Sequence, residues 1–137
     1  MAAIDGNDEG GAGIQIKPAH FPGRVPIDTY GAGGFRFAEM SHKGSVLCLP
    51  TGIYSWQVSS IDELVPESLS RLKDETELEV LLIGTGVDIA LLSEPVKEFM
   101  ASLSIRVDSM NTGAAARTYN VLLAEGRAIG AALLAVD

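Results

Sequence analysis

Hydrophobic residues in the second half of the chain follow an order of strand, helix and strand. Residues Glu79–Ile83 form a short, almost wholly apolar run, which is typical of a strand covered on both faces. A helix is predicted to begin at Ser93-Glu94-Pro95, because a capping hydroxyl, an early acid and an early proline suit a helix start. The apolar residues that follow recur at i, i+3, i+4 and i+7, the spacing of one buried helix face. They are Val96, Phe99, Met100 and Leu103.

The same order continues to the end of the sequence. Ile105–Met110 is predicted to be a further strand and Ala128–Val136 a last strand. Between them Thr112–Glu125 has a helical pattern, and Gly126 is predicted to end that helix. The strand, helix and strand between residues 79 and 110 form a crossover unit, which requires the two strands to pair in parallel.

The first half of the chain has the pattern of antiparallel hairpins. Aromatic and β-branched residues lie in three segments, which begin near Phe35, Ser45 and Ile53. Turns that contain glycine separate the segments at His42-Lys43-Gly44 and at Pro50-Thr51-Gly52. We expect the three segments to pair as one small meander.

These elements predict an α/β fold with a mixed sheet, helices packed on it and an N-terminal antiparallel hairpin layer. Residues 17–137 are expected to form this single domain, because a chain of 137 residues has the usual size of one domain. A helix is also expected from Pro66, with Leu69 and Leu72 on one face. Residues 1–16 combine glycines with small and acidic residues, so we expect a disordered acidic tail there.

Charge narrows the class of partner. The 18 acidic and 10 basic residues give a net charge of −8. Nucleic acids are bound through clustered Lys and Arg, so we expect no nucleic acid partner, and anionic membrane surfaces are disfavoured for the same reason. The sequence has no apolar run near the roughly 20 residues that span a bilayer, and its start lacks the basic segment of a secretory signal. We therefore expect a cytoplasmic protein without direct membrane insertion.

Few residues suit catalysis or metal binding. Cys48, the single cysteine, lies in an apolar run and is expected to be a buried hydrophobic residue instead of a reactive thiol. His20 and His42 have no ligand spacing, so no metal site is predicted. Gly31-Ala32-Gly33-Gly34 does not fit the nucleotide-binding fingerprint and is expected to be a turn before a strand. Without paired acids or a serine motif, the sequence predicts no catalytic residue and no cofactor.

Two glycine-containing loops are predicted to meet at one edge of the sheet. Gly84-Thr85-Gly86 and Asn111-Thr112-Gly113 each follow a predicted parallel strand, and the carboxyl ends of parallel strands share one edge. The second loop opens a helix, whose free N–H groups favour a negative group. Arg117 and Asn120 lie on one face of that helix. With the hydroxyls of Thr85 and Thr112, they predict a site for a carboxylate or a phosphate.

A structural role accounts for the same residues. The two loop glycines then permit a tight turn, and Asn111 or Thr112 caps the helix. Arg117 pairs with a nearby acid, and Asn120 satisfies the backbone of a neighbouring strand. Gly-Thr-Gly also lacks the Gly-Lys-Ser/Thr ending of a phosphate loop. Since Arg117 stays protonated and is a poor base, a ligand site here would favour binding over catalysis.

Several segments, in a fixed order, resemble one protein family. They are Ile27-Asp28 with Tyr30-Gly31 and Gly33–Phe37, Leu82–Gly86, and Met110–Ala124. Over about residues 25–137 the chain resembles a small domain of unknown function that is shared by bacteria, archaea and eukaryotes. This family includes a mitochondrial respiratory complex I assembly factor, and an adipogenesis-associated cytosolic protein resembles the same domain.

The resemblance implies a three-layer sandwich with a central mixed β-sheet and flanking helices. It implies no established enzyme activity and no cofactor. It also implies a polar pocket beside the Gly-Thr-Gly loop. The pocket residues would be Gly84, Thr85, Gly86, Arg117, Thr118 and Asn120. Related sequences often carry cysteine where this chain has Ala116, so thiol chemistry is not expected at this position.

Two functions follow from these patterns. The leading hypothesis is a non-enzymatic binding or assembly module that supports respiratory complex I or membrane-protein assembly. Its partners would be complex I subunits or assembly machinery, and this hypothesis rests mainly on the resemblance. The alternative is a site for a small anionic ligand, or a catalytic site, formed by the Gly84-Thr85-Gly86 loop with Arg117 and Asn120.

Overall fold

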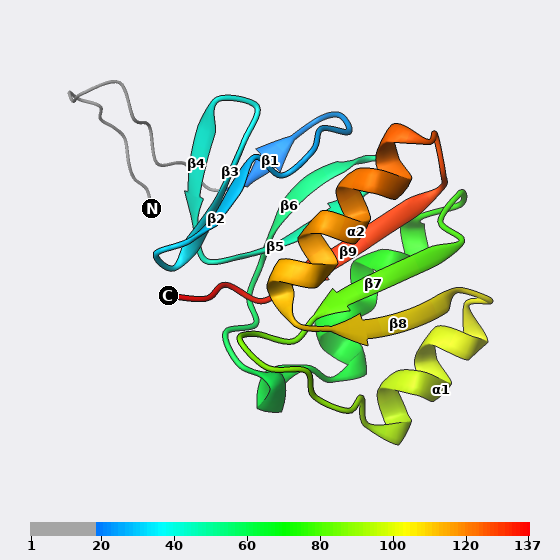
Figure 1. Ribbon diagram of the computed structural model, residues 1–137. Helices are drawn as coiled ribbons and strands as arrows, with labels where there is room; N and C mark the ends of the chain where they lie inside the picture. The colour runs from blue at the N-terminus through cyan, green and yellow to red at the C-terminus, as the bar shows by residue number, and fades with distance from the viewer. Residues whose placement is uncertain (1–18) are drawn as a thin grey trace.

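Six strands form the central sheet of the computed structural model, which describes residues 19–137 (Figure 1). In their order across the sheet they are β1 (His20–Phe21), β6 (Gly52–Trp56), β5 (Ser45–Leu49), β9 (Ile129–Leu133), β7 (Val80–Gly84) and β8 (Arg106–Met110). Strand β7 pairs in parallel with β8 and β9, whereas β5 pairs antiparallel with β6 and β9. The sheet is therefore mixed. The tail expected at residues 1–16 lies outside the described residues.

Two α-helices connect the parallel strands and begin where the sequence predicts. They are α1 (Glu94–Ser102) and α2 (Thr112–Ala124). The Ser93 Oγ caps α1 by accepting a hydrogen bond from the Val96 N–H at 3.4 Å. The Asn111 Oδ1 caps α2 by accepting from the Ala114 N–H at 2.8 Å. Gly126, with a φ of 76°, follows the end of α2, a conformation that a residue with a side chain rarely adopts.

The segment after Pro66 is less regular than the expected helix. It forms the 3-10 helix η3 (Pro66–Asp74), and a short 3-10 helix, η2 (Ile61–Glu63), precedes it. The backbone of Leu69, with a φ of −113° and a ψ of 18°, interrupts η3. Leu69 and Leu72 are still buried, so the apolar pattern identified the buried face although the helix type differs.

The N-terminal hairpin layer is a separate antiparallel sheet. Its strands are β2 (Thr29–Gly31), β3 (Gly34–Phe37) and β4 (Met40–Lys43). The expected meander is therefore wrong, because β3 pairs with β2 and β4 while β5 and β6 join the central sheet. The chain turns at Ala38 and Glu39, which have φ values of 49° and 62°. Neither residue type is a turn signal, so the pattern placed the turn at His42-Lys43-Gly44 instead.

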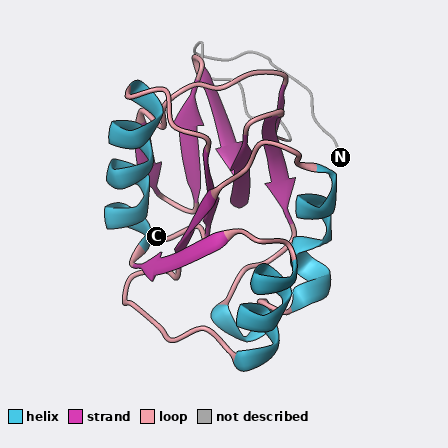
Figure 2. Ribbon diagram, turned by 90° about the vertical axis from the view of Figure 1, so that its right-hand side faces the viewer, coloured by secondary structure: helices cyan, strands magenta, loops and turns pink. Residues whose placement is uncertain are grey.

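Two hydrophobic cores lie on opposite faces of the central sheet. Leu81 and Ile83 belong to the core with α1 and η3, whereas Leu82 belongs to the core with α2, because successive strand residues point to opposite faces. Phe35 and Phe37 of the small sheet complete the α2 core. Figure 2 shows helices on both sides of the strands. The three-layer α/β sandwich is thus confirmed, with the small sheet and α2 on one face.

Candidate functional site

The two glycine-containing loops meet at the carboxyl ends of β7 and β8. The Thr85 N–H donates to the Met110 carbonyl at 2.9 Å, and the Thr112 N–H donates to the Gly86 carbonyl at 2.8 Å. We call residues 84–86 and 111–113 the loop junction. Parallel pairing of β7 with β8 brings these segments together, as chain order predicts.

The threonine hydroxyls of the loop junction are used inside the protein. The fully buried Thr112 hydroxyl donates to the Leu134 carbonyl at 2.7 Å and accepts from the Gly86 N–H at 3.0 Å. The buried Thr85 hydroxyl donates to the Asp88 carbonyl at 2.7 Å and accepts from the Ala90 N–H at 3.0 Å. Both side chains therefore hold loops in place.

Backbone N–H groups at the start of α2 also have hydrogen-bond partners within the protein. An isolated helix leaves its first N–H groups without partners, and this is what attracts an anion. Here the Thr112 N–H bonds to the Gly86 carbonyl, and the Ala114 N–H bonds to the Asn111 side chain. The helix start consequently offers an anion fewer donors than its sequence suggests.

Asn120 connects α2 to the segment before β2. Its Nδ2 donates to the Ile27 carbonyl at 2.8 Å, and its Oδ1 accepts from the Ile27 N–H at 2.8 Å. One side chain thus satisfies both backbone groups of a residue 93 positions away. Thr118 is half-buried on the same helix.

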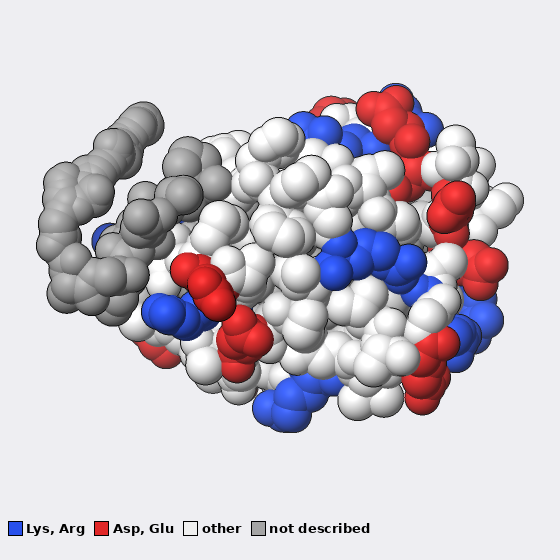
Figure 3. Space-filling view, turned by 90° about the horizontal axis from the view of Figure 1, so that it is seen from above, with Lys and Arg blue, Asp and Glu red and all other residues white. Residues whose placement is uncertain are grey.

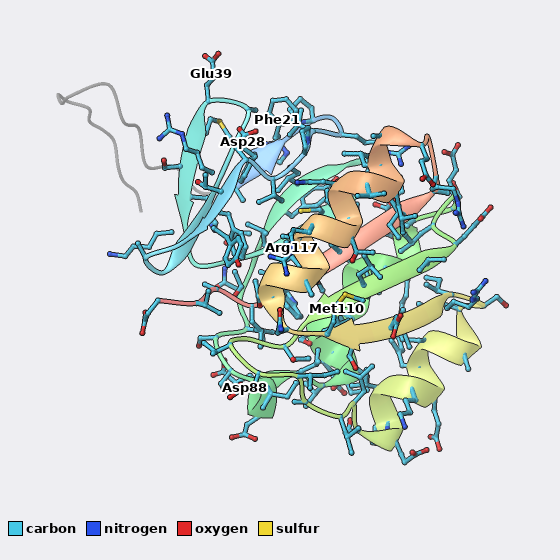
Figure 4. The ribbon with its side chains drawn as sticks, in the orientation of Figure 1. Phe21, Asp28, Glu39, Asp88, Met110 and Arg117 are labelled. Carbon is cyan, nitrogen blue, oxygen red and sulfur yellow. The ribbon has the colours of Figure 1, made fainter. Side chains whose placement is uncertain are left out.

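Arg117 differs from the other predicted site residues because it is exposed and its guanidinium makes no ion pair with any residue in 19–137. Figure 4 shows Arg117 on α2. Tyr30 lies beside it: a Cβ atom at Gly113 would be 2.9 Å from the Tyr30 Cζ and 3.4 Å from the Arg117 Nη1. Sequence reasoning did not place Tyr30 at the site, because no local spacing links it to Gly113, which lies 83 residues later in the chain.

The groups with shifted pKa values lie outside the loop junction. Burial raises the pKa of the Cys48 thiol in β5, so this thiol is held in its unreactive protonated form. Burial likewise raises the pKa of the Tyr119 hydroxyl. Hydrogen bonds from the Ser59 backbone and hydroxyl lower the pKa of the exposed Glu63 carboxyl.

Comparison with known proteins places the chain in a family. Residues 27–134 match the family described as "Protein of unknown function (DUF498/DUF598)". An uncharacterized protein of Rhodobacter capsulatus is 41% identical over 114 residues, which cover 83% of this chain and 87% of that protein. The chain belongs to the DUF498/DUF598 family.

A further protein of similar sequence is a named assembly factor. The NADH dehydrogenase [ubiquinone] 1 alpha subcomplex assembly factor 3 of Mus musculus is 33% identical over 122 residues, which cover 88% of this chain. The match spans 66% of that assembly factor. A crystal structure described as an outer membrane protein of Bartonella henselae is 50% identical, with a TM-score of 0.81. The similarity covers 86% of this chain and 100% of the Bartonella henselae chain.

The described part of this DUF498/DUF598 member contains few groups for other kinds of site. Among residues 19–137, no three His, Cys, Asp or Glu side chains gather where they would hold a metal ion. Within the same range, no helix has the length and apolar character needed to cross a membrane. On the face seen in Figure 3, Lys and Arg residues are separated by acidic and uncharged ones. Of the predicted site residues, Thr85, Gly86 and Thr112 are joined at the loop junction by hydrogen bonds or through the paired ends of β7 and β8. Arg117 lies near Gly113, whereas Asn120 bonds to Ile27 instead.

Proposed function

We propose that this chain is a non-enzymatic, cytoplasmic assembly module, which binds a protein partner during assembly of respiratory complex I or of another membrane-protein complex. The observation that carries the proposal is the 33% identity with the mouse assembly factor over 122 residues. This match extends over most of the described domain, so the similarity covers the whole fold instead of one short motif.

The contacts at the loop junction favour binding over catalysis. The hydroxyls of Thr85 and Thr112 hold neighbouring backbone groups, so neither is poised to attack a substrate. Arg117 is exposed, and a guanidinium is a poor general base. An assembly module needs a stable surface and no reacting group, and these contacts meet that requirement.

Deletion of the gene tests this proposal directly. We expect the amount of assembled complex I, measured by native gel electrophoresis of membranes, to fall in the deletion strain. Expression of the wild-type chain should restore it, and a tagged chain should co-purify with complex I subunits. An unchanged amount of intact complex I in the deletion strain would contradict the assembly role.

A second candidate function is the binding of a small anion at the loop junction, centred on Arg117 with the neighbouring Gly84, Thr85, Gly86, Thr112, Thr118 and Asn120. The observation that favours it is the exposed Arg117 guanidinium, which lies beside Tyr30 without an ionic partner in residues 19–137. An Arg guanidinium binds carboxylates and phosphates through paired hydrogen bonds.

Thermal unfolding with phosphate and with a panel of carboxylates tests this second function. A ligand at a hundredfold excess over its dissociation constant should stabilise the protein by about 2.7 kcal/mol. Arg117→Ala should abolish this stabilisation and leave the melting temperature without ligand unchanged. If no anion in the panel shifts the melting temperature of the wild-type chain, the anion site is excluded.

A further inference from the structure

Exposed apolar side chains gather on the loop that joins β7 to α1. In this loop Val87 is 73% exposed, Ile89 is 63% exposed and Leu91 is 91% exposed. Val65, before η3, is 43% exposed. Within residues 19–137 these four are most of the large hydrophobic residues that face solvent, the others being Tyr30 and Val121. Single exposed hydrophobic residues are normal, whereas a cluster of them marks an interaction surface.

Leu91 and Val65 line the same hollow. The hollow has a volume of about 530 Å³, and its lining comes from residues 61–66 and from residues 90–95. Ile61, Pro66 and Pro95 contribute further apolar surface. We call this hollow and the loop of residues 87–91 the apolar groove. Figure 1 shows the loop passing beside the short helices that precede β7.

The backbone of the loop is held at both ends. At its start, the Thr85 hydroxyl bonds to the Asp88 carbonyl and to the Ala90 N–H. At its end, Leu92 is buried in the hydrophobic core and Ser93 caps α1. Thr85, which chain order suggested as a ligand contact, therefore positions the loop that bears Val87 and Ile89.

Acidic residues border the apolar groove. Asp62 lines the hollow, Asp88 lies in the loop between Val87 and Ile89, and Glu94 opens α1. Figure 4 shows Asp88 in the lower part of the molecule, near the short helices that precede β7. Glu94 has a basic partner in Lys97 at 3.5 Å. An acidic border attracts Lys and Arg and disfavours an anionic lipid surface, so it selects a protein partner over a membrane.

We propose that the apolar groove binds an amphipathic helix of a partner protein, whose apolar stripe is flanked by Lys or Arg. An amphipathic helix presents side chains at i, i+3, i+4 and i+7 to such a groove. The apolar stripe covers Val87, Ile89 and Leu91, and its basic flanks meet Asp62 and Asp88. This inference rests on the proposed assembly function, for which it names the contact surface.

A variant with three substitutions, V87S, I89S and L91S, removes the apolar contacts without changing the charge. The control is V121S, which replaces a 59% exposed valine on α2. Since all four residues are exposed, both proteins should melt like the wild type. The probe is a synthetic helical peptide with leucines at i, i+3, i+4 and i+7 and flanking lysines, and its binding is measured by fluorescence anisotropy.

We expect the lysine peptide to bind the wild type and V121S equally, and to bind the triple variant at least about tenfold more weakly. A peptide with glutamates in place of the lysines should bind the wild type more weakly than the lysine peptide. Equal binding by the triple variant, or no binding by the wild type, would overturn the proposal. Binding of the wild type to phosphatidylglycerol vesicles that the triple variant loses would assign the groove to a membrane instead.

Complementation of the deletion strain with the triple variant separates this inference from the assembly function. If the gene deletion lowers complex I and the triple variant restores it fully, the groove is wrong and the assembly role stands. If the deletion leaves complex I unchanged, the assembly role fails and the peptide titration alone decides the groove. Light scattering tests whether a second copy of this chain occupies the groove. If the wild type is a dimer and the triple variant is a monomer, the proposal is overturned.

Discussion

Two buried hydroxyls and one half-buried amide side chain connect the elements around the loop junction and α2. Thr85, Thr112 and Asn120 each bond to backbone groups that are distant in sequence or belong to a loop. Such groups are costly to leave without partners once they are buried, so each side chain stabilises the fold more than an exposed polar residue does. At the residue scale, these predicted site residues connect separate elements through hydrogen bonds.

Removal of the Thr112 hydroxyl should destabilise the protein. In Thr112→Val the Leu134 carbonyl loses a donor and the Gly86 N–H loses an acceptor, which we expect to lower the free energy of unfolding by about 1–3 kcal/mol. Urea denaturation followed by circular dichroism measures the change. Thr112→Ser retains the hydroxyl and should lose less. Equal stability of the valine variant and the wild type would contradict the bonding described here.

Asn120 and Arg117 should differ in their effect on stability, although they lie on one helix. Asn120→Ala removes two hydrogen bonds to Ile27, each contributing about 0.5–1.5 kcal/mol, so we expect a loss of about 1–3 kcal/mol. Arg117→Ala removes an exposed side chain without an ion pair in residues 19–137 and should change stability by less than about 0.5 kcal/mol. Urea denaturation compares the two. A large loss in Arg117→Ala would show that Arg117 is structural.

At the scale of elements, α2 packs closely against the end of β7. Small residues line the buried face of this helix, including Gly113, Ala115 and Ala116. Gly84, the last residue of β7, permits the approach: a Cβ atom there would lie 2.9 Å from the Thr112 Cα and 3.1 Å from a Leu133 methyl carbon. The close packing of α2 against the end of β7 thus depends on the absence of a side chain at Gly84.

Gly84→Ala should therefore push α2 away from the sheet. We expect a loss of about 1–3 kcal/mol in the free energy of unfolding, because the nearest atom belongs to the backbone of Thr112 and has little freedom to move. Gly23→Ala is the matched control, since its nearest atom is a Phe21 ring carbon at an ordinary 3.5 Å. Thermal unfolding of both variants checks the difference. A control as unstable as Gly84→Ala would point to a general effect of glycine replacement.

At the scale of the whole molecule, the central sheet separates two cores that must form together. Strand β5 is buried along its whole length and contributes Leu47 and Leu49 to one core and Val46 and Cys48 to the other. The two cores share one sheet, so we expect them to unfold as one cooperative unit. Cys48, which is fully buried on β5, is a natural probe of that unit.

Labelling of Cys48 with a thiol reagent should report global unfolding. Burial raises the pKa of the thiol and excludes the reagent, so native protein should not react while denatured protein reacts at one thiol per chain. We expect the labelling rate to rise with urea in parallel with the equilibrium constant for unfolding. Rapid labelling without denaturant would show that β5 opens locally.

Local patterns in the sequence determined most of the secondary structure. The cap at Ser93, the cap at Asn111 and the stop at Gly126 are short-range features, and all three mark helix ends in the structure. The order of strands and helices after residue 79 also predicted parallel pairing of β7 with β8. Parallel strands need a crossover connection between them, and the intervening helix supplies it.

Tertiary structure decided which sheet each hairpin joins and what the site residues do. The turn at Ala38 and Glu39 has no local signal, so the separate small sheet depends on tertiary packing, in which Phe35 and Phe37 join the core that α2 also lines. Asn120 bonds to Ile27, and Arg117 lies beside Tyr30, across more than 80 positions of chain. Residue type defines which hydrogen bonds a side chain is able to make. The fold alone selects the partner, because contacts between distant residues depend on how the elements pack.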